Sequence, residues 1–348
     1  MNYITELLMS LVFSTAENAD YSDNAYAAIN TLQSKWYDAK TGLWDNLWWQ
    51  SGSMVETIAK FGMEDESFKQ TAIAIVSNTY DKSRNQAGAA DWKNNFYDDE
   101  GWWAMGWISA YDLTGDVKYL DTAKDIFEDM TTGWNTPCKG GIWWDKSRTS
   151  IAAISNELFL AVGASLANRV DAADKKHYLD WAQMEWDWFW NSGIINSDHL
   201  INDGIDNTTC KNDGKTTFTY TQGVILAGLS ELARATSDGG YVGHAYHFAS
   251  SSINKLSQGG ILTEPVSGPL DIQSALFKGA FVRGLSALNA NQPDGTFSAF
   301  LQRNADAAWN QDNRGGGLIP DRWQGGSTNV NTASHMAGID ALYAAATA

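Results

Sequence analysis

Apolar residues recur along the chain with the period of an α-helix, and two kinds of helical segment alternate. Segments of the first kind, such as 117–127, carry one apolar stripe with charged residues opposite, which is typical of a helix with one face in water. Segments of the second kind, such as 223–229, are apolar nearly all round, which is typical of a buried helix. Six such pairs follow one another, at a spacing of roughly 45–70 residues.

The boundaries of these pairs can be placed from the pattern. The half-exposed segments are expected to begin near Tyr21, Glu66, Val117, Lys175, Gly243 and Thr296. The buried segments are expected to follow loops at 47–49, 97–99, 142–144, 218–220, 269–271 and 327–329. Six exposed and six buried helices in alternation predict two concentric rings, an all-α (α/α)6 barrel. An open helical solenoid is the alternative, and the lack of polar capping repeats favours closure.

Little else interrupts the helical pattern. A short hairpin is expected within 200–219, because Gly, Asn and Asp are common there and suit turns. No low-complexity linker divides the sequence, so 17–348 is expected to form a single domain.

The loops that precede the buried helices would emerge at the same end of such a barrel, so we expect a cleft there. They hold most of the tryptophans. The candidate ligand-contacting residues from these loops and the following helix starts are Asn46, Trp48, Trp49, Tyr97, Trp102, Trp143, Trp144, Asn156, Glu157, Tyr220 and Gln222.

Three consecutive carboxylates, Asp98, Asp99 and Glu100, stand directly before the pair Trp102 and Trp103. Like charges repel and an apolar wall disfavours the ionised form, so one acid can stay protonated while its neighbour stays charged. That is what glycosidic bond cleavage requires, and indole faces stack on sugar rings. The alternative is a structural one, since acids in a first helical turn meet the positive end of the helix dipole.

The spacing of the acids bears on stereochemistry. Adjacent residues can bring carboxyls to the ~5–5.5 Å of a retaining glycosidase, but would struggle to reach the ~6.5–9.5 Å of an inverting one. Asp98 and Asp99 are therefore the expected catalytic pair, with retention of configuration. Glu100 is interpreted as a helix-start charge or a hydrogen-bonding partner.

Composition narrows the ligand class. The chain has 348 residues, 17 Trp, 13 Tyr and 13 Phe, and a net charge of −17. This charge would repel nucleic acid and anionic membranes, so a neutral or cationic ligand is expected. The five His share no ligand spacing, and neither a dinucleotide-binding nor a phosphate-binding glycine motif is found, so no metal or cofactor is expected. Cys138 and Cys210 fit either one disulfide or two buried thiols.

The ends of the chain suggest export. Residues 7–13 are apolar and 14–16 resemble a small-x-small cleavage site, although Glu6 and the lack of Lys or Arg weaken the pattern. We interpret 1–16 as a weak signal segment. No stretch is long enough to span a membrane, and 342–348 does not resemble a lipid-anchor signal. A secreted monomer, cell-wall associated or released, is expected.

The sequence of 95–107, Asn-Phe-Tyr-Asp-Asp-Glu-Gly-Trp-Trp-Ala-Met-Gly-Trp, resembles the Tyr-Asp-Asp-x-x-Trp signature of glycoside hydrolase family 76. Supporting blocks occur in the family's order at 140–144, 155–158 and 218–223, so the resemblance covers most of the chain. That family comprises endo-α-1,6-mannanases and fungal cell-wall relatives.

The resemblance implies an (α/α)6 barrel and a retaining mechanism without a metal. It makes Asp98 the nucleophile, Asp99 the general acid/base, and α-1,6-mannan the substrate. A cell-wall transglycosylase with the same acids stays open, and a non-catalytic mannan-binding barrel would be expected to lack at least one of the two. Other enzymes of this fold fit less well: epimerases normally place His in the cleft, and unsaturated-uronide hydrolases need basic residues.

Overall fold

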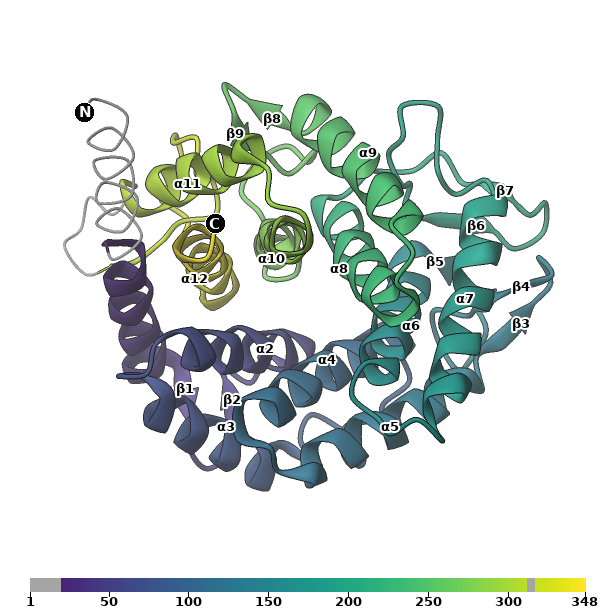
Figure 1. Ribbon diagram of the computed structural model, residues 1–348. Coiled ribbons are helices and arrows are strands. Elements are labelled where there is room, and N and C mark those ends of the chain that lie inside the picture. The colour runs from purple at the N-terminus through teal and green to yellow at the C-terminus, as the bar shows by residue number, and fades with distance from the viewer. Residues whose placement is uncertain (1–19, 312–316) are drawn as a thin grey trace, which may run out of the picture.

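The computed structural model describes residues 20–311 and 317–348, and the helices in these ranges form two concentric rings (Figure 1). The inner ring consists of α2 (Trp48–Glu64), α4 (Tyr97–Thr114), α6 (Ala153–Ala167), α8 (Thr219–Thr236), α10 (Phe277–Asn291) and α12 (Thr332–Ala346). The outer ring consists of the helix at 20–36, α3 (Lys69–Ser83), α5 (Val117–Thr131), α7 (Lys175–Asn191), α9 (Gly240–Lys255) and α11 (Gly295–Trp309). The predicted (α/α)6 barrel is confirmed.

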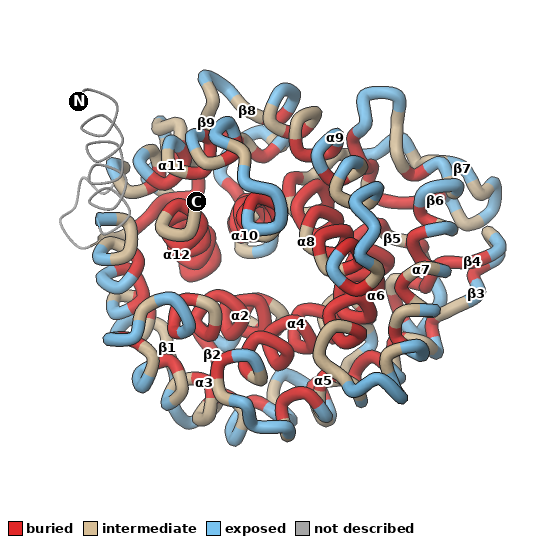
Figure 2. Tube along the Cα trace, in the orientation of Figure 1, coloured by how far each residue is buried: buried red, intermediate tan, exposed pale blue. Residues whose placement is uncertain are grey.

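Burial separates the two rings as the hydrophobic pattern requires. Every residue of α6 is buried, whereas α5 buries one stripe and leaves its charged face in water. Figure 2 shows the same contrast around the whole barrel, with the inner helices mostly buried and the outer helices exposed on one side. Burial of the inner ring is the main source of stability for these helices, because isolated helices of this length are marginal in water.

Glycines allow the inner helices to approach one another closely. A Cβ atom added to Gly106 of α4 would lie 2.6 Å from the carbonyl oxygen of Gly52 on α2. A Cβ added to Gly284 of α10 would meet the backbone of Gly223 on α8. Both positions therefore exclude any side chain, and the inner ring is tight as a result.

The observed outer helices begin within three residues of the predicted positions. Two inner helices begin several residues after the loops that were expected to precede them directly. In the third unit the strands β4 (Gly140–Ile142) and β5 (Ile151–Ala152) precede α6. In the fifth unit the 3-10 helix η1 (Ser274–Leu276) precedes α10.

Short β-strands lie in the connections between the helices. β1 (Tyr37–Asp38) pairs with β2 (Leu43–Trp44), β3 (Trp134–Thr136) with β4, and β8 (Ser257–Gln258) with β9 (Ile261–Leu262). β5, β6 (Gly204–Asp206) and β7 (Lys211–Asn212) form one antiparallel sheet, in the order β5-β6-β7. β6 and β7 confirm the predicted hairpin.

A disulfide between Cys138 and Cys210 joins the β3–β4 turn to the β6–β7 turn, 72 residues further along the chain. It resolves the two alternatives left open for these cysteines. By chain-entropy arguments a loop of this length contributes about 4 kcal/mol to stability. The disulfide therefore holds these two turns together beside α6 and α7.

No helix among the described residues is long and apolar enough to cross a membrane. The segment 1–16, interpreted from its sequence as a weak signal, lies outside the described residues.

Candidate active site

Asp98 and Asp99 occupy the first turn of α4, which a neighbouring loop fixes in place. The backbone N–H of Tyr97 donates to the carbonyl of Trp144 at 3.0 Å, and Phe96 forms an antiparallel bridge with Asp145. The loop after β4 is thereby held against the residues that enter α4. Both acids also lie at the positive end of the helix dipole, which favours carboxylates.

Asp98 accepts one side-chain hydrogen bond. The indole Nε1 of Trp144 donates to its Oδ2 at 3.1 Å, while Oδ1 is buried with no hydrogen-bond partner among the described residues. The Trp144 ring packs on Phe96 with ring centres 4.7 Å apart. Burial, followed by the nearby charge of Asp99, raises the pKa of Asp98 well above its usual range.

Asp99 accepts a hydrogen bond from the side-chain amide of Asn94 at 2.7 Å. Burial raises the pKa of Asp99, and the Asn94 amide offsets part of that rise because it stabilises the charged form. The two acids therefore titrate as one pair, and the pKa values of the pair lie above those of free carboxyls.

Glu100, the third acid of the run, is fully buried. Its Oε1 accepts from the backbone N–H of Asn94 at 2.8 Å and from Lys146 Nζ at 2.7 Å. Burial nevertheless raises the pKa of Glu100 to about 9, so the cost of desolvation exceeds the attraction of Lys146. At neutral pH this contact is a hydrogen bond to a neutral acid, and Glu100 supports the loops around Asp98 and Asp99.

Aromatic side chains from other inner helices form a line at the same end of the barrel. Trp49 of α2 stacks on Trp102 of α4, with ring centres 5.5 Å apart, and its Nε1 donates to Gln273 Oε1 at 2.5 Å. Phe277 lies 6.4 Å from Trp49 and stacks face to face on Tyr220 of α8 at 3.9 Å. The starts of four inner helices therefore contribute to one aromatic wall, and exposed aromatic faces are the kind of surface that stacks on sugar rings.

Tyr220 links the acid pair to a neighbouring cavity. Burial raises the pKa of its hydroxyl well above the usual range, and the negative charges of Asp203 and Asp98 raise it further. Asp203 belongs to the lining of a cavity of about 530 Å³ over the β5-β6-β7 sheet. Ser150, which also lines it, accepts a hydrogen bond from the backbone of Trp144. Polar groups therefore extend from Asp98 toward this sheet.

Each tryptophan pair divides its two rings between different environments. Trp49 and Trp144 keep part of their surface exposed, whereas Trp102 is only 3% exposed and packs against Trp49. Trp48 is 9% exposed and lies 5.0 Å from the fully buried Trp103, and Trp143 is 8% exposed. Contact of the buried rings of Trp48, Trp102 and Trp143 with a ligand stays a prediction.

Other candidate residues are occupied by structural contacts. Tyr97 is buried, with its hydroxyl 3.0 Å from Thr132 Oγ1. The Asn156 side chain is fully buried and bonds both backbone groups of Ile142. The Gln222 side chain likewise hydrogen-bonds both the backbone N–H and the carbonyl of Ile201. The two amides complete backbone hydrogen bonding beside the inner helices. That Tyr97, Asn156 and Gln222 contact substrate stays a prediction.

The last two candidate residues, Glu157 and Asn46, differ in burial. Glu157 is fully buried, and neither carboxyl oxygen has a hydrogen-bond partner among the described residues. Burial, and then the charge of Glu185 on α7, raise the pKa of Glu157 well above the usual range, which favours its neutral form. Its expected contact with substrate stays a prediction. Asn46 is exposed in the loop before α2, with a left-handed φ of 56°, and stays a candidate.

Sequence reasoning missed Asn94, Gln273 and Phe277. Asn94 precedes the acid pair by a few residues, and an amide beside two carboxyls was a usable signal. Gln273 and Phe277 lie far from that pair in sequence and near no motif, so only the fold identifies them. Among the described residues no group of three or more His, Cys, Asp or Glu side chains is arranged to hold a metal ion.

Residues 14–347 match the model of glycosyl hydrolase family 76. The chain belongs to this family. A putative mannan endo-1,6-alpha-mannosidase of Schizosaccharomyces pombe is 25% identical over 321 residues, which cover 83% of this chain and 70% of that protein. The mannan endo-1,6-alpha-mannosidase DCW1 of Eremothecium gossypii is 24% identical over 210 residues, which cover 55% of this chain and less than half, 46%, of the relative.

Solved structures show that family 76 proteins share this fold. The Lin0763 protein of Listeria innocua superposes with a TM-score of 0.82 at 25% identity, covering 94% of this chain and 97% of that one. An inactive variant of the alpha-1,6-mannanase GH76A of Salegentibacter, in complex with alpha-1,6-mannotetrose, gives a TM-score of 0.79 at 23% identity. The alignment covers 94% of this chain and 98% of that one. That variant replaces two consecutive aspartates by alanine.

Proposed function

We propose that the protein is a retaining, endo-acting glycoside hydrolase that cleaves α-1,6-mannosidic linkages of yeast-type mannan. The observation that carries the proposal is the pair Asp98 and Asp99, adjacent in sequence, half-buried in the first turn of α4 and beside an aromatic wall. Such a pair offers one protonated and one charged carboxyl near neutral pH, as glycosidic cleavage requires.

Relatives support the choice of linkage. The curated relatives bear the name mannan endo-1,6-alpha-mannosidase, and the solved relative with an α-1,6-mannan oligosaccharide is inactive when two consecutive aspartates are replaced. Asp98 and Asp99 are the consecutive aspartates at the aromatic end of this barrel. We therefore infer that the same linkage is cleaved here, by an exported monomer; a disulfide is typical of an oxidising compartment.

The proposed reaction proceeds in two steps. Asp98 attacks the anomeric carbon as a carboxylate while Asp99 gives its proton to the glycosidic oxygen, which leaves with the bonding electron pair. A water molecule then attacks the glycosyl–Asp98 ester; Asp99 takes the water's proton and Asp98 leaves as a carboxylate. Two displacements on one carbon restore the original configuration.

The proposed assignment requires the proton of the pair to lie on Asp99 when the substrate is attacked. Positive charge that develops on the sugar ring favours this, because it stabilises an ionised Asp98. The reverse assignment, with Asp99 as nucleophile, is the alternative that the experiment below separates.

Two other functions compete with hydrolysis. A transglycosylase would use the same covalent intermediate and pass the mannosyl chain to a sugar hydroxyl. A mannan-binding barrel would not turn over, although both acids are present. Reaction with linear α-1,6-mannan, with and without an added acceptor oligosaccharide, distinguishes the three functions. A hydrolase releases new reducing ends, a transglycosylase elongates the acceptor, and a binding protein leaves both sugars unchanged.

Replacement of the acids tests the site itself. Asp98→Asn and Asp99→Asn should each lower the rate on linear α-1,6-mannan by at least about a thousandfold. With an aryl α-mannooligoside, whose aryloxide leaves without a proton, azide should restore activity to the acid/base variant Asp99→Ala and give a retained glycosyl azide, whereas with Asp98→Ala the product azide should be inverted. Exposed Asn95→Ala is the matched control. Near-normal turnover in either asparagine variant rules out the proposed pair, and exchanged azide products would assign Asp99 as nucleophile.

A further inference from the structure

Gln273 is an exposed residue in the turn that leads into η1, at the same end of the barrel as Asp98 and Asp99. Its side-chain oxygen accepts two hydrogen bonds. Trp49 Nε1 donates to Gln273 Oε1 at 2.5 Å, and Gln50 Nε2 donates to the same oxygen at 3.0 Å. The side chain of Gln273 therefore joins the turn before α10 to the first turn of α2.

These two contacts fix the direction of the Gln273 amide. An indole N–H can only donate, so the atom that it meets must be the amide oxygen and not the amide nitrogen. Gln50 is oriented in the same way, because its Nε2 also lies 3.4 Å from the carbonyl oxygen of Ile272, which can only accept. The nitrogen of Gln273 is thus turned away from both donors, and no residue that the structure describes accepts a hydrogen bond from it.

The turn that carries Gln273 is held by hydrogen bonds of its own. Asp271 Oδ1 accepts from the backbone N–H of Gln273 at 3.1 Å and from that of Ser274 at 2.7 Å. The backbone N–H of Leu270 donates to Asp321 Oδ2 at 2.7 Å. The amide donor is therefore preorganised, which lowers the entropy lost when it binds a ligand.

The indole that contacts Gln273 lies beside the acid pair. Trp49 keeps part of its surface exposed and stacks on Trp102, with ring centres 5.5 Å apart. Trp102 follows Asp98 by one helical turn on α4, so these two residues share a face of the helix. The exposed part of Trp49 and the amide of Gln273 are therefore placed where a unit of a glycan bound at the acids would meet them.

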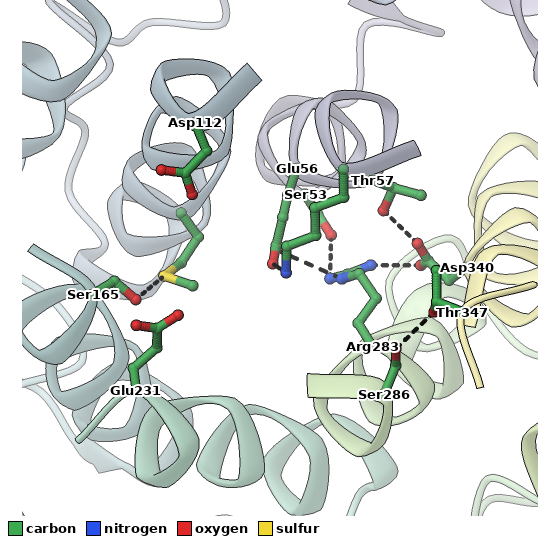
Figure 3. Close-up of polar contacts among 12 residues, drawn as sticks. Ser53, Glu56, Thr57, Asp112, Ser165, Glu231, Arg283, Ser286, Asp340 and Thr347 are labelled. Carbon is green, nitrogen blue, oxygen red and sulfur yellow. Dashed lines mark hydrogen bonds and ion pairs between the residues drawn. The ribbon is translucent and has the colours of Figure 1, made fainter. Parts of the chain in front are cut away.

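Trp102 is also in contact with a buried charge network. The Arg283 guanidinium carbon lies 5.9 Å from the centre of the Trp102 ring, within the range of a cation–π contact. Figure 3 shows Arg283 reaching from α10 toward Ser53 of α2 and Asp340 of α12, to which it donates at 2.7 and 2.5 Å. All three of these residues are buried. The ring on which Trp49 stacks is thus held firmly in place.

An aromatic ring with an amide donor at its edge suits a sugar. The indole N–H lies in the plane of the ring, so Gln273 lies at the edge of Trp49 and leaves the ring face free of this contact. A pyranose stacked on that face carries hydroxyl oxygens around its own perimeter, and one of them can accept from Gln273 Nε2. A purely apolar ligand would leave the donor unused, and a cation would be repelled by it.

We propose that Gln273 is a substrate-binding residue whose amide N–H donates to a hydroxyl oxygen of the mannosyl unit that stacks on Trp49. The identity of the sugar rests on the proposed function, whereas the direction of the amide rests on its contacts alone. The competing role is support of Trp49, with the nitrogen in water only. The two roles differ in whether the amide protons of Gln273 respond to the glycan.

NMR of the full-length Asp98→Asn protein labelled with ¹⁵N-glutamine tests this directly, because this variant should bind the glycan without turnover. Addition of α-1,6-mannotetraose should move an Nε2–H resonance of Gln273 downfield and saturably. Loss of that resonance in Gln273→Met assigns it. Gln292, which is exposed at the other end of α10, is the internal control and should not shift. Unshifted Gln273 amide protons in the sugar-saturated protein would overturn the proposal.

Calorimetry in the same Asp98→Asn background measures what the contact contributes. Gln273→Met should weaken binding of mannotetraose by at least about threefold, the loss expected for one hydrogen bond, and Gln292→Met should leave it unchanged. An unchanged affinity in Gln273→Met would also overturn the proposal. If Asp98→Asn binds no mannotetraose at all, the proposed substrate itself is contradicted, and this inference with it.

Discussion

The indole Nε1 of Trp144 donates a hydrogen bond to Asp98 Oδ2 at 3.1 Å, across 46 positions of sequence. This is the direct link between the loop after β4 and the carboxyl pair at the start of α4. It is also the side-chain donor that offsets part of the pKa rise that burial causes at Asp98. The contact therefore controls both the orientation and the charge of one acid.

Trp144→Phe should keep the packing on Phe96 and remove the N–H donor. An indole N–H stabilises the ionised carboxyl, so its loss should raise the pKa of Asp98 further and move the acidic limb of the pH–rate profile to higher pH. The rate at neutral pH should fall about tenfold to a hundredfold. Trp143→Phe, which has no contact with Asp98, is the control. An unchanged acidic limb would contradict this role.

Asn94→Ala should act on the other acid. The amide donates to Asp99 at 2.7 Å and lowers its pKa, so removal should raise the pKa of Asp99. The proposed acid/base must be protonated to act in the first step, and the basic limb of the pH–rate profile should therefore move to higher pH. The measurement is the profile of kcat/KM on a soluble mannooligosaccharide, with Asn95→Ala as control. A shift to lower pH would be inconsistent with Asp99 as the proton donor.

Glu100→Gln separates a supporting acid from a catalytic one. Burial keeps the pKa of Glu100 at about 9, so glutamine closely imitates the neutral acid that is present at pH 7. Its oxygen can still accept from Asn94 and Lys146, and the rate should stay within about tenfold of wild type. Activity on linear mannan is the measurement. A loss as large as that of Asp98→Asn would place Glu100 in the reaction.

Two buried acids should make stability depend on pH. Glu157 and Glu185 are fully buried, and burial raises the pKa of both well above the usual range. The folded state then binds protons that the unfolded state releases, so the contribution of these two acids to the free energy of unfolding is highest below about pH 4 and declines as the pH rises. Glu185→Gln should flatten this decline and raise Tm at pH 8. Exposed Glu66→Gln should leave the slope unchanged.

The helical architecture could be predicted because its signal is periodic and repeated six times. Alternation of one-sided and all-round apolar helices follows directly from which ring a helix joins, and even the starts at Val117 and Lys175 agree. The acid pair could be predicted because Asp98 and Asp99 are neighbours in sequence and need no fold to bring them together.

Most of the cleft could not be predicted in this way. Asn156 and Gln222 interrupt apolar helices and suggested ligand contacts, but each completes backbone hydrogen bonds of a nearby strand or loop. Sequence shows that a buried amide needs a partner and does not show which partner it has. Phe277 and Gln273 meet Trp49 only through closure of the ring, a relationship without a local sequence signal.

The most direct test of the proposed mechanism is ¹H NMR of the reducing ends released from linear α-1,6-mannan in the first minutes of reaction. A retaining endo-acting enzyme predicts that oligosaccharides with the α-anomer appear first and that the β-anomer grows in only by mutarotation. Initial release of the β-anomer, or of mannose alone, would contradict it.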